Sequence, residues 1–153
     1  MNRRRRAKNT PPPRAVSQPS PPGLLRRLAA LAYDALLLLS VWFAATLAVL
    51  PLRGGEAFRP HDPAYLAYLM LVGLGFLGWF WTHGGQTLGM RAWKIKIVAE
   101  GGGALSWKQA ALRYVCAWAS LGLLGLGFLW IGVDSRRRAW HDLASGTRMV
   151  REG

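Results

Sequence analysis

Residues Leu28 to Leu50 read LAALAYDALLLLSVWFAATLAVL and contain a single charged side chain, Asp34. As a helix, this stretch is about 35 Å long, which is enough to cross a hydrocarbon core of about 30 Å. Pro51 ends the predicted helix, because the residue before a proline disfavours the helical conformation. We therefore predict a membrane-spanning helix over residues 28–50.

A second apolar stretch, Ala64 to Thr82, follows a polar loop that contains glycines and prolines. Its helical length is about 28 Å. Tyr65 and Tyr68 lie near one end, and Trp79 and Trp81 lie near the other, as aromatic residues at membrane interfaces do. This pattern predicts a second span over residues 64–82.

A third uncharged run extends from Tyr114 to Val133 and is long enough for one crossing. Gly122, Gly125 and Gly127 divide it into halves of about ten residues, the length of re-entrant segments. Two interpretations stay open, a single span or a re-entrant hairpin. A re-entrant hairpin agrees better with the distribution of charge.

The net charge of +13 comes from 20 Lys and Arg against 7 Asp and Glu, and the basic residues are unevenly placed. Only Arg53 and Arg59 lie between the first and second runs. A re-entrant third run puts 18 basic residues on one side and 2 on the other, whereas a single crossing gives 13 and 7. The positive-inside rule favours the first split and predicts that both termini are cytoplasmic. The charge thus sets orientation, and we expect no nucleic-acid partner.

Residues 1–22 contain six of the nine prolines and many basic residues, but almost no large apolar side chain. Such a segment is typical of a disordered cytoplasmic tail, which would attract anionic lipid. Residues 23–153 are then one membrane domain. The predicted fold class is an all-α membrane protein, a small multi-pass helical bundle.

The polar segment before the third run carries a short strand signal. Residues Trp93 to Ile97 alternate apolar and basic side chains, as a half-buried strand does. Glu100 to Gly103 can form a turn, and Ala104 to Ser106 a short return strand. We predict an amphipathic, β-hairpin-like cytoplasmic loop.

Asp34 is unusual, because an acid at the middle of a spanning helix costs about 2.5–3.5 kcal/mol. Arg27 lies on the same helical stripe, about 10 Å away, too far for direct pairing. Each residue is therefore expected to find a partner elsewhere, among Arg113, His141 and Asp142. Alternatively, Asp34 is hydrated near the interface and Arg27 is an anchor that reaches the interface.

We find no nucleophile–base set and no cluster of metal ligands, so we predict no enzymatic activity, cofactor or metal. Residues Gly73 to Gly78 match the dinucleotide-binding pattern G-x-G-x-x-G, but they lie inside a predicted span. That motif requires a strand before it and free helix amides after it. The glycines instead indicate close helix packing in lipid.

Three blocks together resemble the RDD family, named for one Arg and two Asp. They are RLAALAYD (residues 27–34), GQTLGMR (residues 85–91) and HDLASGT (residues 141–147). The resemblance covers about residues 26–150. It departs from the family pattern at Met90, where many members carry Lys.

The resemblance implies a multi-pass protein of the bacterial inner membrane, and it leaves two functional hypotheses. In one, the protein is transport-related, and Asp34 carries a proton or cation as in the cation/proton exchange proposed for some members. A bundle this small would then require a homo-oligomer or other membrane proteins. In the other, the charged residues are structural pairs in a non-catalytic membrane scaffold or accessory subunit.

Overall fold

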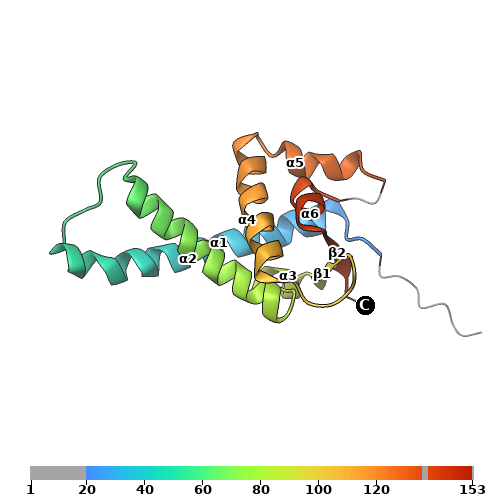
Figure 1. Ribbon diagram of the computed structural model, residues 1–153, viewed down its shortest axis with the longest axis horizontal. Coiled ribbons are helices and arrows are strands. Elements are labelled where there is room, and N and C mark those ends of the chain that lie inside the picture. The colour runs from blue at the N-terminus through green and yellow to red at the C-terminus, as the bar shows by residue number, and fades with distance from the viewer. Residues whose placement is uncertain (1–19, 136–137, 153) are drawn as a thin grey trace, which may run out of the picture.

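The computed structural model describes residues 20–135 and 138–152, and within them the protein is mainly helical (Figure 1). In chain order the elements are α1 (Leu24–Val49), η1 (Leu50–Arg53), α2 (Pro63–His83), α3 (Leu88–Ala92), β1 (Ile95–Ala99), α4 (Trp107–Gly122), α5 (Leu126–Leu129), η2 (Trp130–Gly132), α6 (Trp140–Ser145) and β2 (Thr147–Arg151). The far ends of α1 and α2 project as a hairpin from a compact body formed by the other elements (Figure 1). The predicted class, an all-α membrane protein, is confirmed, and the structure also contains a small two-stranded antiparallel sheet.

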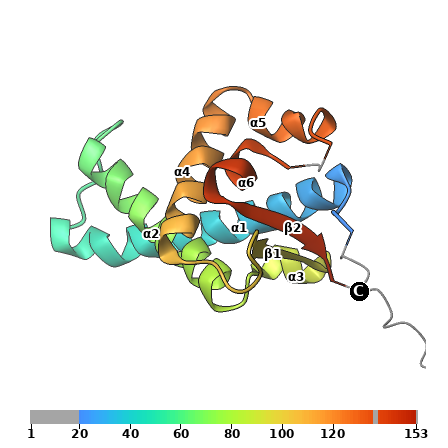
Figure 2. The ribbon, with the colours of Figure 1, turned by 45° about the vertical axis from the view of Figure 1, so that its right-hand side comes forward.

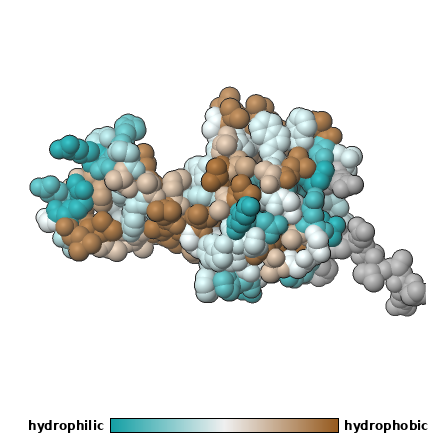
Figure 3. Space-filling view, viewed as in Figure 1, coloured by the Kyte–Doolittle hydropathy of each residue, from teal (hydrophilic) through white to brown (hydrophobic). Residues whose placement is uncertain are grey.

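Two helices are long and apolar enough to cross a membrane, residues 24–53 and α2. They cover the two spans predicted at residues 28–50 and 64–82. Asp62 starts α2, because its carboxylate accepts hydrogen bonds from the amides of Ala64 and Tyr65. Apolar side chains dominate the surface along the projecting hairpin, and polar ones gather at its tip (Figure 3).

Two glycines of the G-x-G-x-x-G stretch lie where α2 contacts other helices. A Cβ on Gly73 would lie 2.5 Å from the Tyr114 hydroxyl and 3.3 Å from Trp42 Nε1. A Cβ on Gly78 would lie 2.7 Å from the Trp107 ring. These glycines therefore allow α2 to approach α1 and α4 closely, as the sequence indicated.

The third apolar run is broken rather than one straight helix. The axis of α4 and that of residues 126–132 differ by 106°. At the break, Leu124 and Gly125 have φ angles of 54° and 78°, and the Gly125 amide donates to the Ser120 carbonyl over 2.8 Å. Glycine adopts this left-handed conformation without steric cost. The predicted division into two halves is thus observed.

The strand predicted near Trp93 is present as β1, but its predicted partner is wrong. β1 pairs antiparallel with β2, from Ile95 opposite Arg151 to Ala99 opposite Thr147. Residues 104–106 form no strand, since the Ser106 hydroxyl and the Gln109 side chain make a capping box that starts α4. They are the entry to a helix.

Residues 1–19 lie outside the described residues, so the tail predicted at residues 1–22 is seen only from Ser20 to Pro22. That short piece is part of the folded body. The Arg151 amide donates to the Ser20 carbonyl over 3.0 Å, and Pro22 is fully buried. Ser20 and Pro22, inside the predicted tail, therefore contact the folded body.

The core lies where the first half of α1 meets α2, α3, β1 and α4. Its most buried side chains include Ile95 and Ile97 of β1 and Ala110 of α4. α1 passes between α3 and α6 (Figure 2). The buried face of α1 consists of Arg27, Ala30, Asp34 and Leu38, and this face carries both predicted charges into the core.

Candidate functional site

Asp142 of α6 is fully buried and binds two arginines from different helices. Arg27 Nη1 of α1 lies 3.1 Å from Asp142 Oδ2, and Arg113 Nη1 of α4 donates to Oδ1. The Ala139 amide also donates to Oδ2, over 3.0 Å. One carboxylate therefore joins α1, α4 and α6.

Around this ion bridge, hydroxyl groups fix the end of α6 and the start of β2. Arg113 Nη1 donates to Thr147 Oγ1 over 2.9 Å, and Thr147 Oγ1 lies 2.8 Å from Ser145 Oγ. Ser145 Oγ in turn donates to the His141 carbonyl. The Arg113 guanidinium carbon lies 5.5 Å from the centre of the Trp81 ring, within cation–π range. Arg113 is thus held from several sides.

Burial and charge set the protonation of the two acid–base groups of α6. Burial lowers the pKa of His141, and Arg113 and Arg27 lower it further, to about 3 despite the attraction of Asp142. Burial alone would raise the pKa of Asp142, but Arg113 and its other neighbours outweigh burial and hold that pKa at about 2. At neutral pH, Asp142 is therefore ionised and His141 is neutral.

Asp34 binds a different part of the chain. Thr87 Oγ1 donates to Asp34 Oδ2, and the Gly89 amide donates to Oδ1 over 2.9 Å. Thr87 Oγ1 also accepts from the Met90 amide over 3.2 Å, so it caps α3. Asp34 is 8% exposed, and its carboxylate holds the start of α3 against α1.

This arrangement corrects the expectation that Asp34 pairs with a cation. Within residues 20–135 and 138–152, its partners are a hydroxyl and an amide, because Asp142 takes both arginines. The alternative, a hydrated interfacial Asp34, also disagrees with its burial.

Gly89 allows the close contact between α1 and α3. A Cβ at this position would lie 2.5 Å from the Ala30 carbonyl oxygen and 2.7 Å from Asp34 Oδ1. No larger residue fits without moving one of the two helices. This contact gives a physical reason for Gly89 in the block GQTLGMR (residues 85–91).

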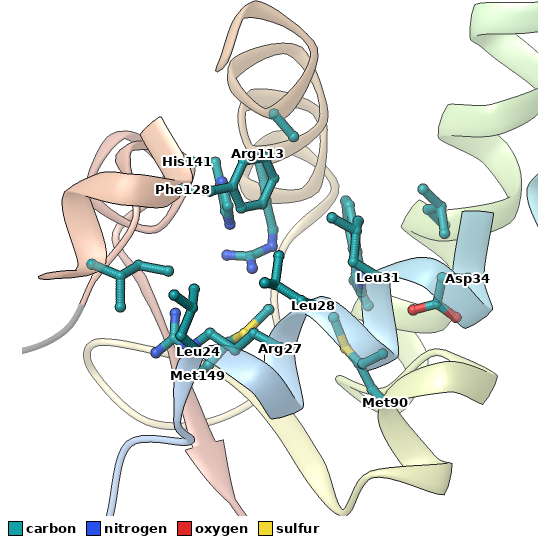
Figure 4. A pocket seen from close by; sticks show the side chains of 15 residues that line it. Leu24, Arg27, Leu28, Leu31, Asp34, Met90, Arg113, Phe128, His141 and Met149 are labelled. Atoms are coloured by element: carbon teal, nitrogen blue, oxygen red, sulfur yellow. The ribbon is translucent and has the colours of Figure 1, made fainter. Parts of the chain in front are cut away.

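The five predicted residues meet around one cavity of about 90 Å³, which four of them line (Figure 4). Arg27, Arg113 and His141 lie at one end, and Asp34 lies at the other (Figure 4). Asp142 does not line the cavity but binds both arginines. Apolar side chains from α1, α2, α4 and the α5–η2 segment make up most of the wall.

Sequence reasoning gave no role to Thr87, Gly89 or Thr147, which contact these five residues. It placed Trp81 at a membrane interface, but Trp81 is buried in the core beside Arg113. Two signals were available. A threonine with a helix-forming segment after it is a helix start, which fits Thr87. Thr147 and Val150 are β-branched residues, which favour a strand and fit β2.

The part of the chain that the structure describes contains no group of three or more His, Cys, Asp or Glu residues that could hold a metal ion.

A protein-family model described as the RDD family matches residues 21–146. The match includes Arg27, Asp34 and Asp142, the residues around which the site is built. Comparisons with curated proteins and with solved structures gave no significant match.

Proposed function

Because this membrane protein belongs to the RDD family, we propose that it is transport-related and that Asp34 binds and releases a proton or a monovalent cation. The observation that carries the proposal is the position of Asp34. It is a buried carboxylate within a candidate span, it lines a cavity, and its described partners are neutral. Ionisable residues that face a cavity inside a membrane domain commonly mark ion pathways.

The two carboxylates have different roles in this proposal. Asp142 is bound by two guanidinium groups, which favour its ionised form, and it serves as a permanent structural charge. Asp34 is bound by a hydroxyl and an amide, so a proton or a cation can neutralise its charge without breaking an arginine pair. Asp34 is therefore the group that exchanges an ion.

We further propose an inner-membrane location in which both termini face the cytoplasm and the broken third run re-enters. The 106° bend and the uneven distribution of basic residues support this topology. Few residues of α1 and α2 are buried within one chain, so a closed ion path needs a homo-oligomer or another membrane subunit. The role is non-enzymatic.

A second candidate is a non-catalytic scaffold or accessory subunit. One specific observation favours it: the two buried charged residues of α1, Arg27 and Asp34, connect this helix to segments far away in the sequence. In this view the buried charges specify how the helices assemble.

Ion flux separates the two candidates. The purified full chain is reconstituted into liposomes that contain a pH-sensitive dye, and Na⁺ or K⁺ gradients are imposed. We expect cation-dependent proton flux with wild type, and none with Asp34→Asn at unchanged folding. Glu56→Gln, at an exposed position in the tip of the hairpin, is the matched control and should retain flux.

Flux that survives in Asp34→Asn would remove Asp34 from the mechanism. A well-folded wild type without flux would favour the scaffold.

A further inference from the structure

The arginine end of the cavity has unused capacity to bind an anion. Both described hydrogen bonds of Arg113 come from Nη1, to Asp142 and Thr147. Its Nε and Nη2 donate to no other described residue, and its guanidinium points into the cavity (Figure 4). A guanidinium presents a planar fork of donors that suits a carboxylate or a phosphate.

Two residues near this guanidinium, Trp81 and His141, each carry a polar atom that lacks a described partner. Trp81 Nε1 and His141 Nδ1 are buried and form no hydrogen bond within the described parts of the chain. Both residues line the cavity. Because buried polar atoms are nearly always hydrogen-bonded, this pair indicates that a partner binds here.

The rest of the cavity is apolar and leads to the surface of the protein. On α1, Leu24, Leu28 and Leu31 line it and are 41%, 43% and 39% exposed. Phe128 and Ile131, from the α5–η2 segment, line it as well. In a membrane protein, such leucines contact lipid chains. The cavity thus combines a cationic end with an apolar rim.

We propose that this cavity binds the anionic headgroup of a membrane amphiphile, a carboxylate or a phosphate, with Arg113 as its principal partner. A volume of about 90 Å³ accommodates a group the size of a few water molecules, hence a headgroup and not a chain. The acyl chain leaves the cavity along Leu24, Leu28 and Leu31. A free anion would gain nothing from this apolar rim, and a neutral lipid would gain nothing from the guanidinium.

Asp34 does not oppose this binding, because it lies at the opposite end of the cavity and its oxygens bind Thr87 and Gly89 (Figure 4). The proposed ligand is therefore independent of any ion exchange at Asp34.

The test compares an acid with its ester. The full chain, in a non-ionic detergent, is titrated with oleate, methyl oleate, acetate and inorganic phosphate, and binding is followed by calorimetry and native mass spectrometry. We expect oleate to bind at 1:1 and methyl oleate to bind at least roughly tenfold more weakly, because the ester forms no charge-assisted hydrogen bond. Acetate and phosphate should bind more weakly than oleate by a similar factor.

Cavity-filling variants locate the site without touching the Arg113–Asp142 pair. Ala117→Phe, inside the cavity, and Leu28→Trp, at its rim, should each weaken oleate binding at least roughly tenfold, and because the added rings fill empty space the melting temperature should stay near that of wild type. Ala119→Phe, an exposed position on the same helix, is the matched control and should bind like wild type.

Three results would overturn the proposal. They are equal binding of the ester and the acid, equal binding of a free anion and oleate, and wild-type binding by the folded cavity variants. If Ala117→Phe does not fold, Leu28→Trp decides the location alone.

Discussion

Arg27 and Asp34 lie on the same buried face of α1, and each binds a different distant segment of the chain. Arg27 reaches Asp142 of α6, whereas Asp34 receives hydrogen bonds from Thr87 and Gly89 at the start of α3. One helical stripe therefore fixes both the middle and the C-terminal part of the domain. This arrangement explains why two buried charged residues are retained in a helix that is mainly apolar.

Removing the carboxylate of Asp142 should be strongly destabilising. Asp142→Ala leaves Arg27 and Arg113 buried without their shared anion, which costs about 3–5 kcal/mol for a buried pair. Thermal and denaturant unfolding in detergent measure the effect. The control is Glu100→Gln, which breaks an exposed pair with Arg138 and should change stability by less than about 1 kcal/mol. Similar losses in both variants would contradict the central role of Asp142.

Asp34→Ala should destabilise the protein more than Asp34→Asn. Alanine leaves the Thr87 hydroxyl and the Gly89 amide without an acceptor, at a cost of about 1–3 kcal/mol for each buried group. Asparagine can accept from Gly89 and donate to Thr87, so it keeps both contacts. Folded yield and melting temperature measure the difference. If both variants behave like wild type, Asp34 does not hold α3.

Gly89→Ala should disturb the contact between α1 and α3. The added methyl group would meet the Ala30 carbonyl and Asp34, and overpacking of this kind costs about 1–3 kcal/mol. Gly75→Ala is the matched control, since a Cβ there meets nothing within 4 Å and alanine favours the helix. The melting temperature should fall for the first variant and stay level or rise for the second. The reverse order would show that α3 is not packed as described.

Stability should fall as the pH decreases from about 6.5 towards 3. His141 has a native pKa of about 3 against an ordinary value of 6.5, so the unfolded chain binds a proton that the native protein excludes. The free energy of unfolding then falls by at most about 1.4 kcal/mol per pH unit. His141→Gln should flatten this dependence in unfolding measured between pH 4 and 7, and His61→Gln, at the exposed tip, should not.

Asp142 has a native pKa of about 2, below its ordinary 3.8, so its contribution is complete above about pH 4 and is lost as the pH falls towards 2. Above about pH 4, Asp142 therefore adds nothing to the pH dependence that the His141→Gln comparison measures. An unchanged slope in His141→Gln would mean that this histidine is not held neutral by the fold.

Topology is tested with reporters that are active on only one side of the membrane. We expect a fusion after Gly153 to report the cytoplasm and an insertion between Gly54 and Phe58 to report the periplasm, because this arrangement leaves only 2 of the 20 basic residues outside. A periplasmic reporter after Gly153 would instead indicate that the broken third run crosses the membrane.

Local pattern was sufficient for much of this fold. The length and hydropathy of two runs predicted α1 and α2, and Gly122 and Gly125 predicted that the third run is divided. Alternation near Ile95 and Ile97 predicted a strand. These are properties of neighbouring residues, since helix length, glycine conformation and side-chain periodicity act over a few residues. The charges that enter the core could be named for the same reason, because a charge in an apolar run is visible in the sequence.

The choice of partners depended on the three-dimensional path of the chain. Local pattern placed the partner of β1 at residues 104–106, but those residues cap a helix, and β2 supplies the pairing from the C-terminal end. Likewise, Asp142 forms ion pairs with both Arg27 and Arg113. Asp34 instead accepts hydrogen bonds from Thr87 and Gly89. By charge alone, the guanidinium groups of Arg27 and Arg113 could have paired with the carboxylate of Asp34 as well as with that of Asp142. Packing selects among them, because a hydrogen bond forms only where the folded helices bring donor and acceptor within about 3 Å.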